Sequence, residues 1–317
     1  MSEEREPRRM RVIGKRAAAA GVAAVTLADP DGGPVPEWQP GAHIDLVLGD
    51  MTRQYSLCGD PADRESLTVA VLLEPGGRGG SAYVHDKLEI DDEIVIAGPR
   101  NAFGLSPAPS YLFVAGGIGI TPLLPMLRSI EARGLPWRLL YGGRTRASMA
   151  FAEDLAAAHP HRVDLRPQDE YGLLDLEAAL DGLSPDAAVY CCGPEPLLRA
   201  VETACGARDE LTLQVERFAP KAVDPDAPSD SFEVELARTG AVVTVASGES
   251  VLDALERRGV DAEFSCREGT CGTCEVAVLA GRPDHRDSVL TADEQAAGDA
   301  MMICVSRSCT PRLILDL

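Results

Sequence analysis

The chain has 317 residues, of which 45% are hydrophobic and 25% charged, and this composition excludes a disordered or fibrous protein. At about 150 residues per domain, the length predicts two domains or three small ones. The net charge of -20 opposes binding to the phosphate backbone of nucleic acid and favours basic partners.

Neither a membrane segment nor a secretion signal is expected. The longest run of small apolar residues, 17–28, is interrupted by Gly21 and Thr26 and is shorter than the roughly 18 residues that cross a bilayer. The first ten residues lack an apolar segment with a cleavage site, which predicts a cytoplasmic protein. Nine cysteines, three of them crowded into nine residues, indicate a metal site rather than paired disulfides.

Short β-branched runs at 44–48, 67–73 and 93–97, separated by Gly, Pro and Asp clusters, predict a small antiparallel barrel. Between the first two runs, Arg53-Gln54-Tyr55-Ser56-Leu57 alternates along a strand. Its Tyr can stack on a flat ring and its Arg can bind a phosphate through two hydrogen bonds, although a plain strand explains the segment equally well.

A second candidate anion site is the loop 76–81, Gly-Gly-Arg-Gly-Gly-Ser, which precedes a predicted helix at 82–88. Backbone N–H groups, a hydroxyl and the Arg78 guanidinium are available there. A flexible loop is the alternative interpretation.

From residue 111 the pattern changes to strand, turn, helix and strand, which is typical of a parallel sheet. The predicted elements are strands at 111–115, 137–141 and 186–192 and helices at 123–133, 149–158 and 196–205.

The turn 115–122, Ala-Gly-Gly-Ile-Gly-Ile-Thr-Pro, follows a predicted strand and opens a predicted helix. Glycines there allow a diphosphate to approach, and the helix N-terminus stabilises its charge. Pro122 suits a first helical turn but takes the place of the third glycine of the dinucleotide fingerprint, so a plain tight turn is an equal alternative. The segment 190–194, Tyr-Cys-Cys-Gly-Pro, ends a buried strand at the same sheet edge, where ligands bind, unless it is a simple strand exit.

The segment 219–230 holds three prolines and three aspartates and is predicted to be an extended interdomain linker. Beyond it we expect a strand pair at 232–236 and 241–245. A helix at 250–258 should follow, begun by Ser250-x-x-Asp253 and stopped by Gly259.

The strongest signal is Cys266-x4-Cys271-x2-Cys274, followed after 29 residues by Cys304. A two-iron cluster needs four thiolates on a tight loop, and this spacing is the plant-type one. Gly269 and Gly272 would let the loop take positive φ angles. A zinc site is the alternative, but zinc knuckles favour paired C-x2-C units and only one is present. Cys58, Cys205 and Cys309 are expected to be buried or inert thiols.

With these motifs the chain resembles the phthalate dioxygenase reductase and vanillate O-demethylase reductase family over essentially its whole length. The matching segments are 53–58, 77–81, 114–122, 190–194, 266–274, 284–287 and 289–290. The resemblance implies an antiparallel β-barrel flavin domain at 1–106 and an α/β parallel-sheet NAD(P)-binding domain at 107–219. A linker at 220–230 and an α+β, β-grasp-like plant-type 2Fe-2S ferredoxin domain at 231–317 would complete the chain.

The resemblance also implies the cofactors and their binding residues. The residues expected around FMN are Arg53, Tyr55, Ser56, Leu57, Ala70, Val71, Arg78, Gly79, Gly80, Ser81 and Phe218. Those expected around the nicotinamide nucleotide are Gly116, Gly117, Ile118, Gly119, Thr121, Arg144, Cys192, Gly193 and Pro194. The family usually uses NADH. However, Arg144 and Arg146 follow the second strand of the sheet and no acidic residue does, so NADPH stays open.

The implied function is that of the reductase component of a multicomponent oxygenase or demethylase. Electrons would pass from NADH through FMN and the 2Fe-2S cluster to a terminal oxygenase, Rieske-type in the first place and a haem monooxygenase as the alternative. No side chain is expected to act as an acid, base or nucleophile, and Ser56 and Cys192 would orient the rings.

The predicted ferredoxin domain has 15 acidic and 8 basic residues from Phe232 onward, a charge that would steer it to a basic partner. A merely solubilising surface explains the charge equally well. Two further functions are compatible with parts of the sequence: a free-standing flavin reductase or NAD(P)H oxidase, which gives the cluster no role, and a redox sensor without catalysis. The substrate of the oxygenase and the oligomeric state are not readable from the sequence.

Overall fold

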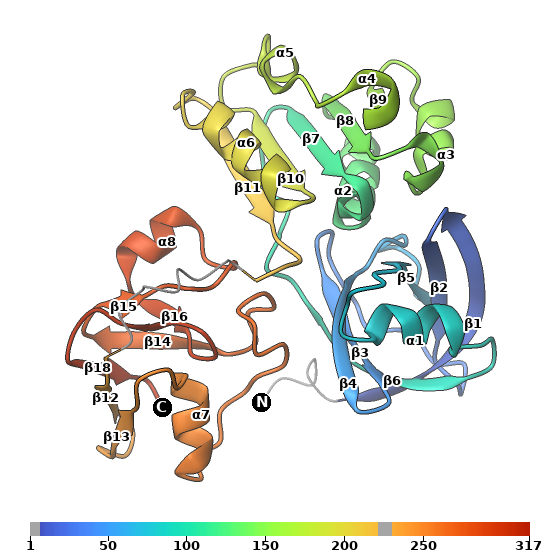
Figure 1. Ribbon diagram of the computed structural model, residues 1–317. Coiled ribbons are helices and arrows are strands. Elements are labelled where there is room, and N and C mark those ends of the chain that lie inside the picture. Colours follow the sequence, from blue (N-terminus) through green and yellow to red (C-terminus); the bar gives the residue numbers. More distant parts are fainter. Residues whose placement is uncertain (1–6, 221–229) are drawn as a thin grey trace. The chain divides into compact units, whose positions relative to one another are not determined.

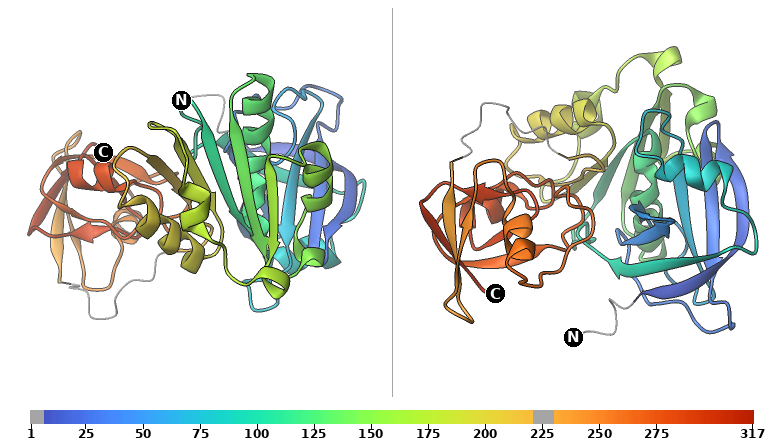
Figure 2. Two further views of the ribbon diagram at one scale, coloured as in Figure 1. Left: turned by 90° about the horizontal axis from the view of Figure 1, so that it is seen from above. Right: turned by 60° about the horizontal axis from the view of Figure 1, so that its bottom comes forward.

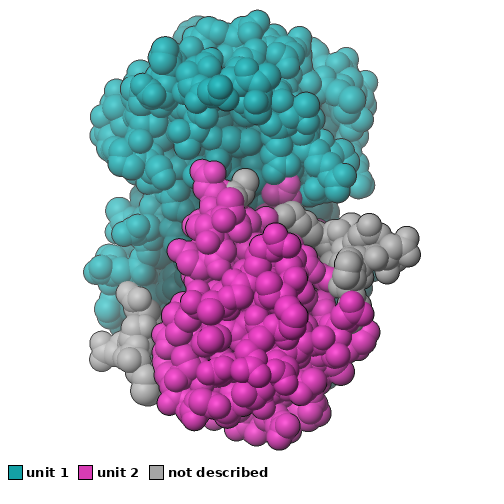
Figure 3. All heavy atoms as spheres, turned by 90° about the vertical axis from the view of Figure 1, so that its left-hand side faces the viewer, with its two compact units in different colours: residues 1–216 teal, residues 217–317 magenta. Residues whose placement is uncertain are grey.

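The computed structural model describes residues 7–220 and 230–317, and the chain divides into two compact units, 1–216 and 217–317 (Figure 3). The predicted linker at 220–230 falls, except for its end residues, outside the described residues. Each unit is described by itself. No helix in the described part of the chain is long and apolar enough to span a bilayer.

The first half of unit 1 is an antiparallel sheet in the order β4-β3-β6-β1-β2-β5 (Figures 1 and 2). Its strands are β1 (Arg8–Ala19), β2 (Val22–Ala28), β3 (His43–Leu48), β4 (Met51–Ser56), β5 (Ser66–Leu72) and β6 (Glu93–Arg100). Alternate side chains such as Ile44, Leu46 and Leu48 are fully buried, as expected for strands with one face toward a core. The three predicted runs all fall in strands, so the predicted antiparallel barrel is confirmed.

The barrel closes through a short seam between the ends of β4 and β5, which stand at the two edges of the sheet order. An isolated bridge joins Leu57 to Val69, and Cys58 N donates to Thr68 O. No ladder joins β4 to β5 elsewhere in the described chain. Helix α1 (Gly80–Asp86) lies against β3, β4 and β5 (Figure 1). Along the rest of its open edge, β4 therefore offers backbone N–H and C=O groups that can form hydrogen bonds with a ligand.

The second half of unit 1 is a parallel sheet in the order β11-β10-β7-β8-β9. Its strands are β7 (Tyr111–Gly116), β8 (Trp137–Gly143), β9 (Val163–Pro167), β10 (Ala188–Cys192) and β11 (Thr212–Glu216). The helices are η2 (Gly117–Gly119), α2 (Ile120–Ala132), η3 (Arg146–Ser148), α3 (Ala152–Ala158), α4 (Gln168–Tyr171), α5 (Leu176–Leu180) and α6 (Glu195–Cys205). Helices α2 and α3 pack on one face and α5 and α6 on the other, which confirms the predicted α/β sheet (Figure 2).

Three local predictions differ from the structure of this half. The predicted helix at 149–158 begins only at Ala152, because Phe151 has a left-handed φ of 64° that no helix accommodates. The predicted helix at 123–133 begins earlier, at Ile120, which puts Pro122 in the first turn as expected. Strands β9 and β11 were not predicted.

One hydrophobic core joins the two halves of unit 1. Val22 and Ala70 of the barrel belong to the same buried cluster as Met126 and Leu127 of α2. The Arg128 guanidinium also donates to Cys58 O, at 3.2 Å. The predicted boundary between residues 106 and 107 therefore lies inside one compact unit.

Unit 2 is an α+β fold with a mixed five-stranded sheet in the order β13-β12-β18-β14-β16. Its strands are β12 (Phe232–Leu236), β13 (Val242–Val245), β14 (Glu275–Ala280), β16 (Ala300–Met302) and β18 (Arg312–Leu315), with β15 (Pro283–Asp284) and β17 (Arg307–Ser308) paired apart. The helices are α7 (Val251–Arg257) and α8 (Ala292–Ala297). As predicted, the Ser250 side chain accepts the N–H of Asp253 at the start of α7, and Gly259 follows the helix with φ 70°.

Candidate functional site

Four cysteine side chains lie together in unit 2. The Sγ atoms of Cys274 and Cys304 are 3.1 Å apart, and Cys266 hydrogen-bonds with Cys271 and Cys304. Cys271, Cys274 and Cys304 are buried, whereas Cys266 is half-buried. The structure thus gathers all four predicted ligands, and the exposed side of the group is that of Cys266.

Backbone geometry explains why the loop can wrap a compact centre. Gly269 and Gly272 have φ angles of 69° and 76°, in the region that favours glycine, as predicted. A Cβ on Gly269 would come within 2.6 Å of the Val305 side chain. The backbone N–H groups of Glu268 and Thr270 point at Cys266 Sγ, at 3.3 and 3.5 Å. Such N–H groups stabilise charge on a sulfur ligand.

The donor set fits a two-iron cluster. Hydrogen bonds from the Cys271 and Cys304 thiols lower the pKa of Cys266, and these contacts together with burial raise the pKa values of both partners. Closely placed thiols supply the two ligands per iron that such a cluster requires.

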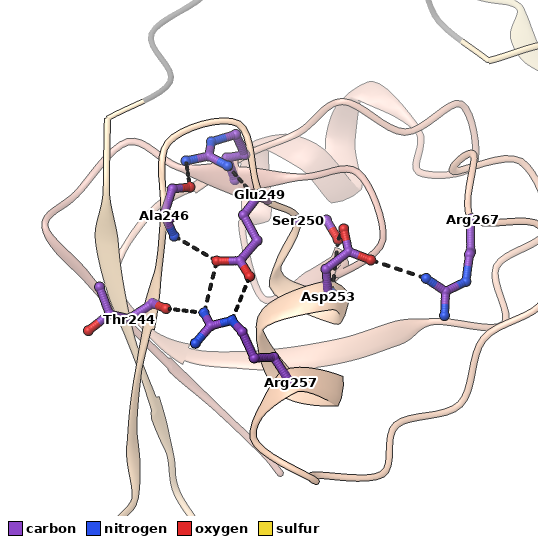
Figure 4. A network of polar contacts seen from close by, with 8 residues as sticks. Thr244, Ala246, Glu249, Ser250, Asp253, Arg257 and Arg267 are labelled. Carbon is purple, nitrogen blue, oxygen red and sulfur yellow. Dashed lines mark hydrogen bonds and ion pairs between the residues drawn. The ribbon is translucent and has the colours of Figure 1, made fainter.

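Arg267, directly after the first cysteine, ties the loop to helix α7 (Figure 4). It has φ 56°, a left-handed conformation that is uncommon for a residue with a side chain. Its guanidinium contacts the carboxylates of Asp253 and Glu256 and lies 4.1 Å from the Phe264 ring centroid. The contacts hold the backbone in a conformation that costs energy by itself.

Asp287 supports the loop from the other side. It is fully buried, and its Oδ2 accepts the N–H groups of Val289 and Leu290 at 3.0 and 2.8 Å. The neighbouring Ser288 N donates to Gly269 O at 2.8 Å. His285, whose Nδ1 is 3.8 Å from Asp287 Oδ1, is buried and has no position among the clustered thiols.

The cysteines outside the cluster differ in exposure. Cys58 is buried, and burial raises its pKa to about 12, so its thiol is inert. Cys205 is also buried. Cys309 is exposed, so of the two expected alternatives burial is wrong for it, and an inert thiol stays a prediction.

The predicted phosphate turn and the segment 190–194 come together at the carboxyl edge of the parallel sheet. A Cβ on Gly119 would lie 2.2 Å from Cys192 O, and one on Gly116 would lie 2.6 Å from Pro194 Cδ. These glycines therefore permit close packing of the two turns. Gly117, with φ 55° and nothing within 4 Å of its Cβ position, is the glycine that faces open space. Thr121 is buried, and its hydroxyl donates to Ile118 O.

Glu216 stands beside Cys192 at this edge and was not predicted. The two residues are register partners in β11 and β10, and Cys192 Sγ is 3.8 Å from Glu216 Oε2. Burial raises the pKa of Glu216 to about 8, and it also raises the pKa of Cys192. The carboxyl therefore holds its proton at neutral pH. A signal existed in the sequence, since Glu216 ends the strand that adjoins Cys192, but β11 itself was not recognised.

Residues of the predicted flavin strand and glycine loop also meet. Arg53 donates through Nη2 to Arg78 O at 2.9 Å, and its side chain crosses Gly80, where a Cβ would lie 2.5 Å from Arg53 Cγ. Gly79 has φ 87°, and Ser81 Oγ accepts the N–H of Glu74. The loop is thus pinned to β4, and the Arg53 side chain packs so closely on Gly80 that a larger residue at position 80 would displace it.

The other residues predicted for the flavin differ in accessibility. Tyr55 is partly buried, and burial raises its pKa to about 12. Ser56 is buried. The side chains of Leu57 and Val71 are buried in the core of the barrel, and that of Ala70 in the core shared with α2, so only their backbones can face a ligand. Phe218 belongs to unit 2 and is 46% exposed.

Sequence comparison identifies two domains. The profile of the 2Fe-2S iron-sulfur cluster binding domain matches residues 234–309, and that of the oxidoreductase NAD-binding domain matches residues 113–203. The chain is 47% identical to the phenoxybenzoate dioxygenase subunit beta of Ectopseudomonas oleovorans, with 87% of each chain covered. It is 35% identical to the phthalate dioxygenase reductase of Burkholderia cepacia, covering 98% of this chain and 97% of that one.

The chain belongs to the phthalate dioxygenase reductase family. Among solved structures, an intact type IV self-sufficient cytochrome P450 monooxygenase matches 98% of the chain at 44% identity with a TM-score of 0.92. The chain spans 41% of that longer protein. As a family member, the protein is an oxidoreductase with an NAD-binding domain and a 2Fe-2S domain, and it is a reductase of the kind that serves oxygenases.

Proposed function

We propose that the protein is the NADH-dependent reductase component of a two-component oxygenase and carries FMN as well as the 2Fe-2S cluster. The observation that supports this best is the four-thiol loop in the same chain as a nucleotide sheet and a barrel with an anion-binding loop. FMN accepts an electron pair from a nicotinamide and releases electrons singly, as a cluster requires. The protein itself binds the nicotinamide nucleotide, FMN and the cluster and orients them.

In the barrel, Arg53, Arg78, Gly80 and Ser81 would hold the FMN phosphate with the backbone of Gly79. The two guanidiniums provide positive charge, and the close packing of the Arg53 side chain on Gly80 holds that guanidinium beside the loop. Tyr55 and Ser56 on β4, with the backbones of Leu57, Ala70 and Val71 along the seam, would hold the flavin ring. Phe218 would close the flavin ring.

In the nucleotide sheet, the N–H groups of Gly117, Ile118 and Gly119 at the start of α2 would bind the diphosphate. Gly116, Gly193 and Pro194 would shape the turn, and Thr121 and Cys192 would lie near the nicotinamide, with Arg144 near the ribose. The thiol of Cys192 stays protonated in its buried position and so serves as an orienting group. In the cluster loop, Cys266, Cys271, Cys274 and Cys304 would be the four iron ligands.

The partner is proposed to be a Rieske-type oxygenase. Two of the relatives are a dioxygenase subunit and a dioxygenase reductase. A haem monooxygenase is the second candidate, because a cytochrome P450 chain contains a segment 44% identical to this one. In either case, 15 acidic against 8 basic residues from Phe232 onward would steer a basic partner to unit 2. Nine free thiols suit a cytoplasmic location.

The decisive experiment measures cofactors and electron flow in the purified full chain. Iron, sulfide and flavin are quantified, and NADH is added anaerobically while flavin and cluster absorbance are followed. Cys304→Ser is expected to lose the cluster yet keep flavin reduction, whereas the matched control Cys309→Ser is expected to keep both. A protein that contains zinc in place of iron, or a Cys304→Ser variant with an intact cluster, would refute the proposal. Oxygenation reconstituted with a Rieske enzyme and with a haem enzyme then distinguishes the two partners.

A further inference from the structure

The residues after the second strand of a nucleotide sheet decide which pyridine nucleotide it accepts. An acidic residue there hydrogen-bonds the ribose 2′-hydroxyl of NADH, whereas arginine binds the 2′-phosphate of NADPH. Here β8 ends at Gly143, and Arg144-Thr145-Arg146 follows. By its own sequence, this segment favours a 2′-phosphate.

The structure shows that Arg146 is already occupied. Its Nε and Nη2 atoms donate to the two carboxylate oxygens of Glu170, at 3.3 and 3.0 Å. Its third nitrogen, Nη1, lies 3.7 Å from Glu153 Oε1. Every nitrogen of the guanidinium therefore faces a carboxylate, in the two-pronged geometry that a phosphate would otherwise take.

Both carboxylates are held by backbone structure. Glu170 lies in α4, which follows the edge strand β9, and the neighbouring Asp169 N donates to Arg144 O at 3.2 Å. Glu153 lies in the first turn of α3. A capping box between Thr145 and Ser148 fixes the turn that carries Arg146. The arrangement thus ties three segments together at one corner of the sheet.

The net charge around Arg144 and Arg146 also disfavours a 2′-phosphate. Arg144 and Arg146 supply two positive charges, and Glu153, Asp154, Asp169 and Glu170 supply four negative ones within these segments. A 2′-phosphate would bring about two further negative charges into a neighbourhood that is already net negative. A neutral hydroxyl meets no such repulsion.

We propose that Glu170 is a specificity-determining residue that makes this site select NADH over NADPH. It occupies Arg146 from the end of the next strand and sets the sign of the charge around the ribose 2′-position, with Glu153 in support. The acidic residue that the sequence lacks after β8 is thus supplied after β9. This inference rests on the proposed function, because it takes the carboxyl edge of the sheet as the nucleotide site.

The test compares binding of NAD⁺ and NADP⁺, which differ only in the 2′-phosphate, to the full-length holoprotein by calorimetry. The wild type is expected to bind NAD⁺ about 30-fold or more tightly. Glu170→Gln should reduce this ratio about tenfold, mainly by tightening NADP⁺ binding, and Glu153→Gln should reduce it less. Glu177→Gln is the matched control, because Glu177 pairs with Arg208 elsewhere on the domain and should leave the ratio unchanged.

A second readout follows the rate of flavin reduction as kcat/KM for NADH and for NADPH. The expected change in Glu170→Gln is a lower KM for NADPH, whereas the control Glu177→Gln should keep the wild-type KM values and the wild-type kcat for NADH. Equal binding of the two nucleotides by the wild type, or an unchanged ratio in Glu170→Gln, would overturn the inference. Failure of both nucleotides to bind would instead count against the proposed function.

Discussion

Arg267 Nη1 lies 3.1 Å from Asp253 Oδ1, so an ion pair joins the first residue after Cys266 to helix α7 (Figure 4). Glu249, the carboxylate just before α7, has partners of its own. Arg257 binds Glu249 and Thr244 O, and Glu249 accepts the N–H of Ala246. The loop and helix α7 are therefore held together, and Arg267, through its contacts with Asp253 and Glu256, can control the shape of the loop that carries Cys266.

Replacing Arg267 should separate the effect of the ion pairs from that of the backbone. Arg267→Ala removes both contacts but leaves a Cβ at positive φ, whereas Arg267→Gly also relieves the backbone. We expect the glycine variant to be about 1 kcal/mol more stable than the alanine variant. Both should lose the cluster faster than wild type under chelation.

The measurements are denaturant unfolding and the decay of cluster absorbance in the presence of an iron chelator. Arg258→Ala, an exposed arginine on the same segment, is the control and should match wild type in both. If Arg267→Ala kept the wild-type decay rate, the ion pairs of Arg267 would have no effect on the stability of the cluster.

Asp287→Ala should destabilise unit 2 more than a surface substitution does. The variant leaves the N–H groups of Val289 and Leu290 without their buried acceptor. Each hydrogen bond to a charged group contributes about 1.5–3 kcal/mol to the free energy of unfolding. Thermal unfolding followed by circular dichroism measures the loss, with Asp293→Asn on the exposed first turn of α8 as the control. Equal melting temperatures for the two variants would contradict the assigned role.

Glu216 should make stability depend on pH. Its pKa in the folded protein is about 8, against an ordinary value of 4.5, so the folded state binds the extra proton between these values. Stability is then greatest at low pH within this range and falls as pH rises through the folded-state pKa. Between about pH 5 and pH 9 we expect wild type to lose roughly 2 kcal/mol relative to Glu216→Gln, less than the full shift implies because the side chain is partly exposed.

Denaturant unfolding of both proteins across this pH range provides the check. Glu202→Gln, a carboxylate on helix α6, serves as the control and should follow wild type. A constant difference between wild type and Glu216→Gln at all pH values would show that the carboxyl titrates normally.

The sequence predicted what local chemistry determines. The Ser250 cap, the glycine φ angles of the cysteine loop and the four thiols all follow from spacing within a few residues. Strands β9 and β11 could not be predicted, because they are half-exposed edge strands and therefore carry no continuous apolar run.

Glu170 and Glu216 could not be predicted from the sequence for one common reason. Glu170 meets Arg146 across 24 residues, and Glu216 meets Cys192 across another 24. Each pairing depends on which strands are neighbours in the sheet, and the strands concerned were the ones not recognised. The register of β10 and β11 places Glu216 opposite Cys192, and the adjacency of β8 and β9 brings α4, with Glu170, beside the turn that carries Arg146.

Gly119→Ala tests whether the two turns at the sheet edge must touch. The new Cβ would lie 2.2 Å from the Cys192 carbonyl oxygen, a backbone atom that cannot move aside alone. We expect a loss of about 2 kcal/mol or more in stability, in the range of other overpacking changes, and weaker NAD⁺ binding. Gly104→Ala is the matched control, since nothing lies within 4 Å of its Cβ position and its φ is not positive. Differential scanning calorimetry and NAD⁺ titration measure both effects, and a Gly119→Ala protein that binds NAD⁺ as wild type does would show that the contact between the turns does not shape the nucleotide site.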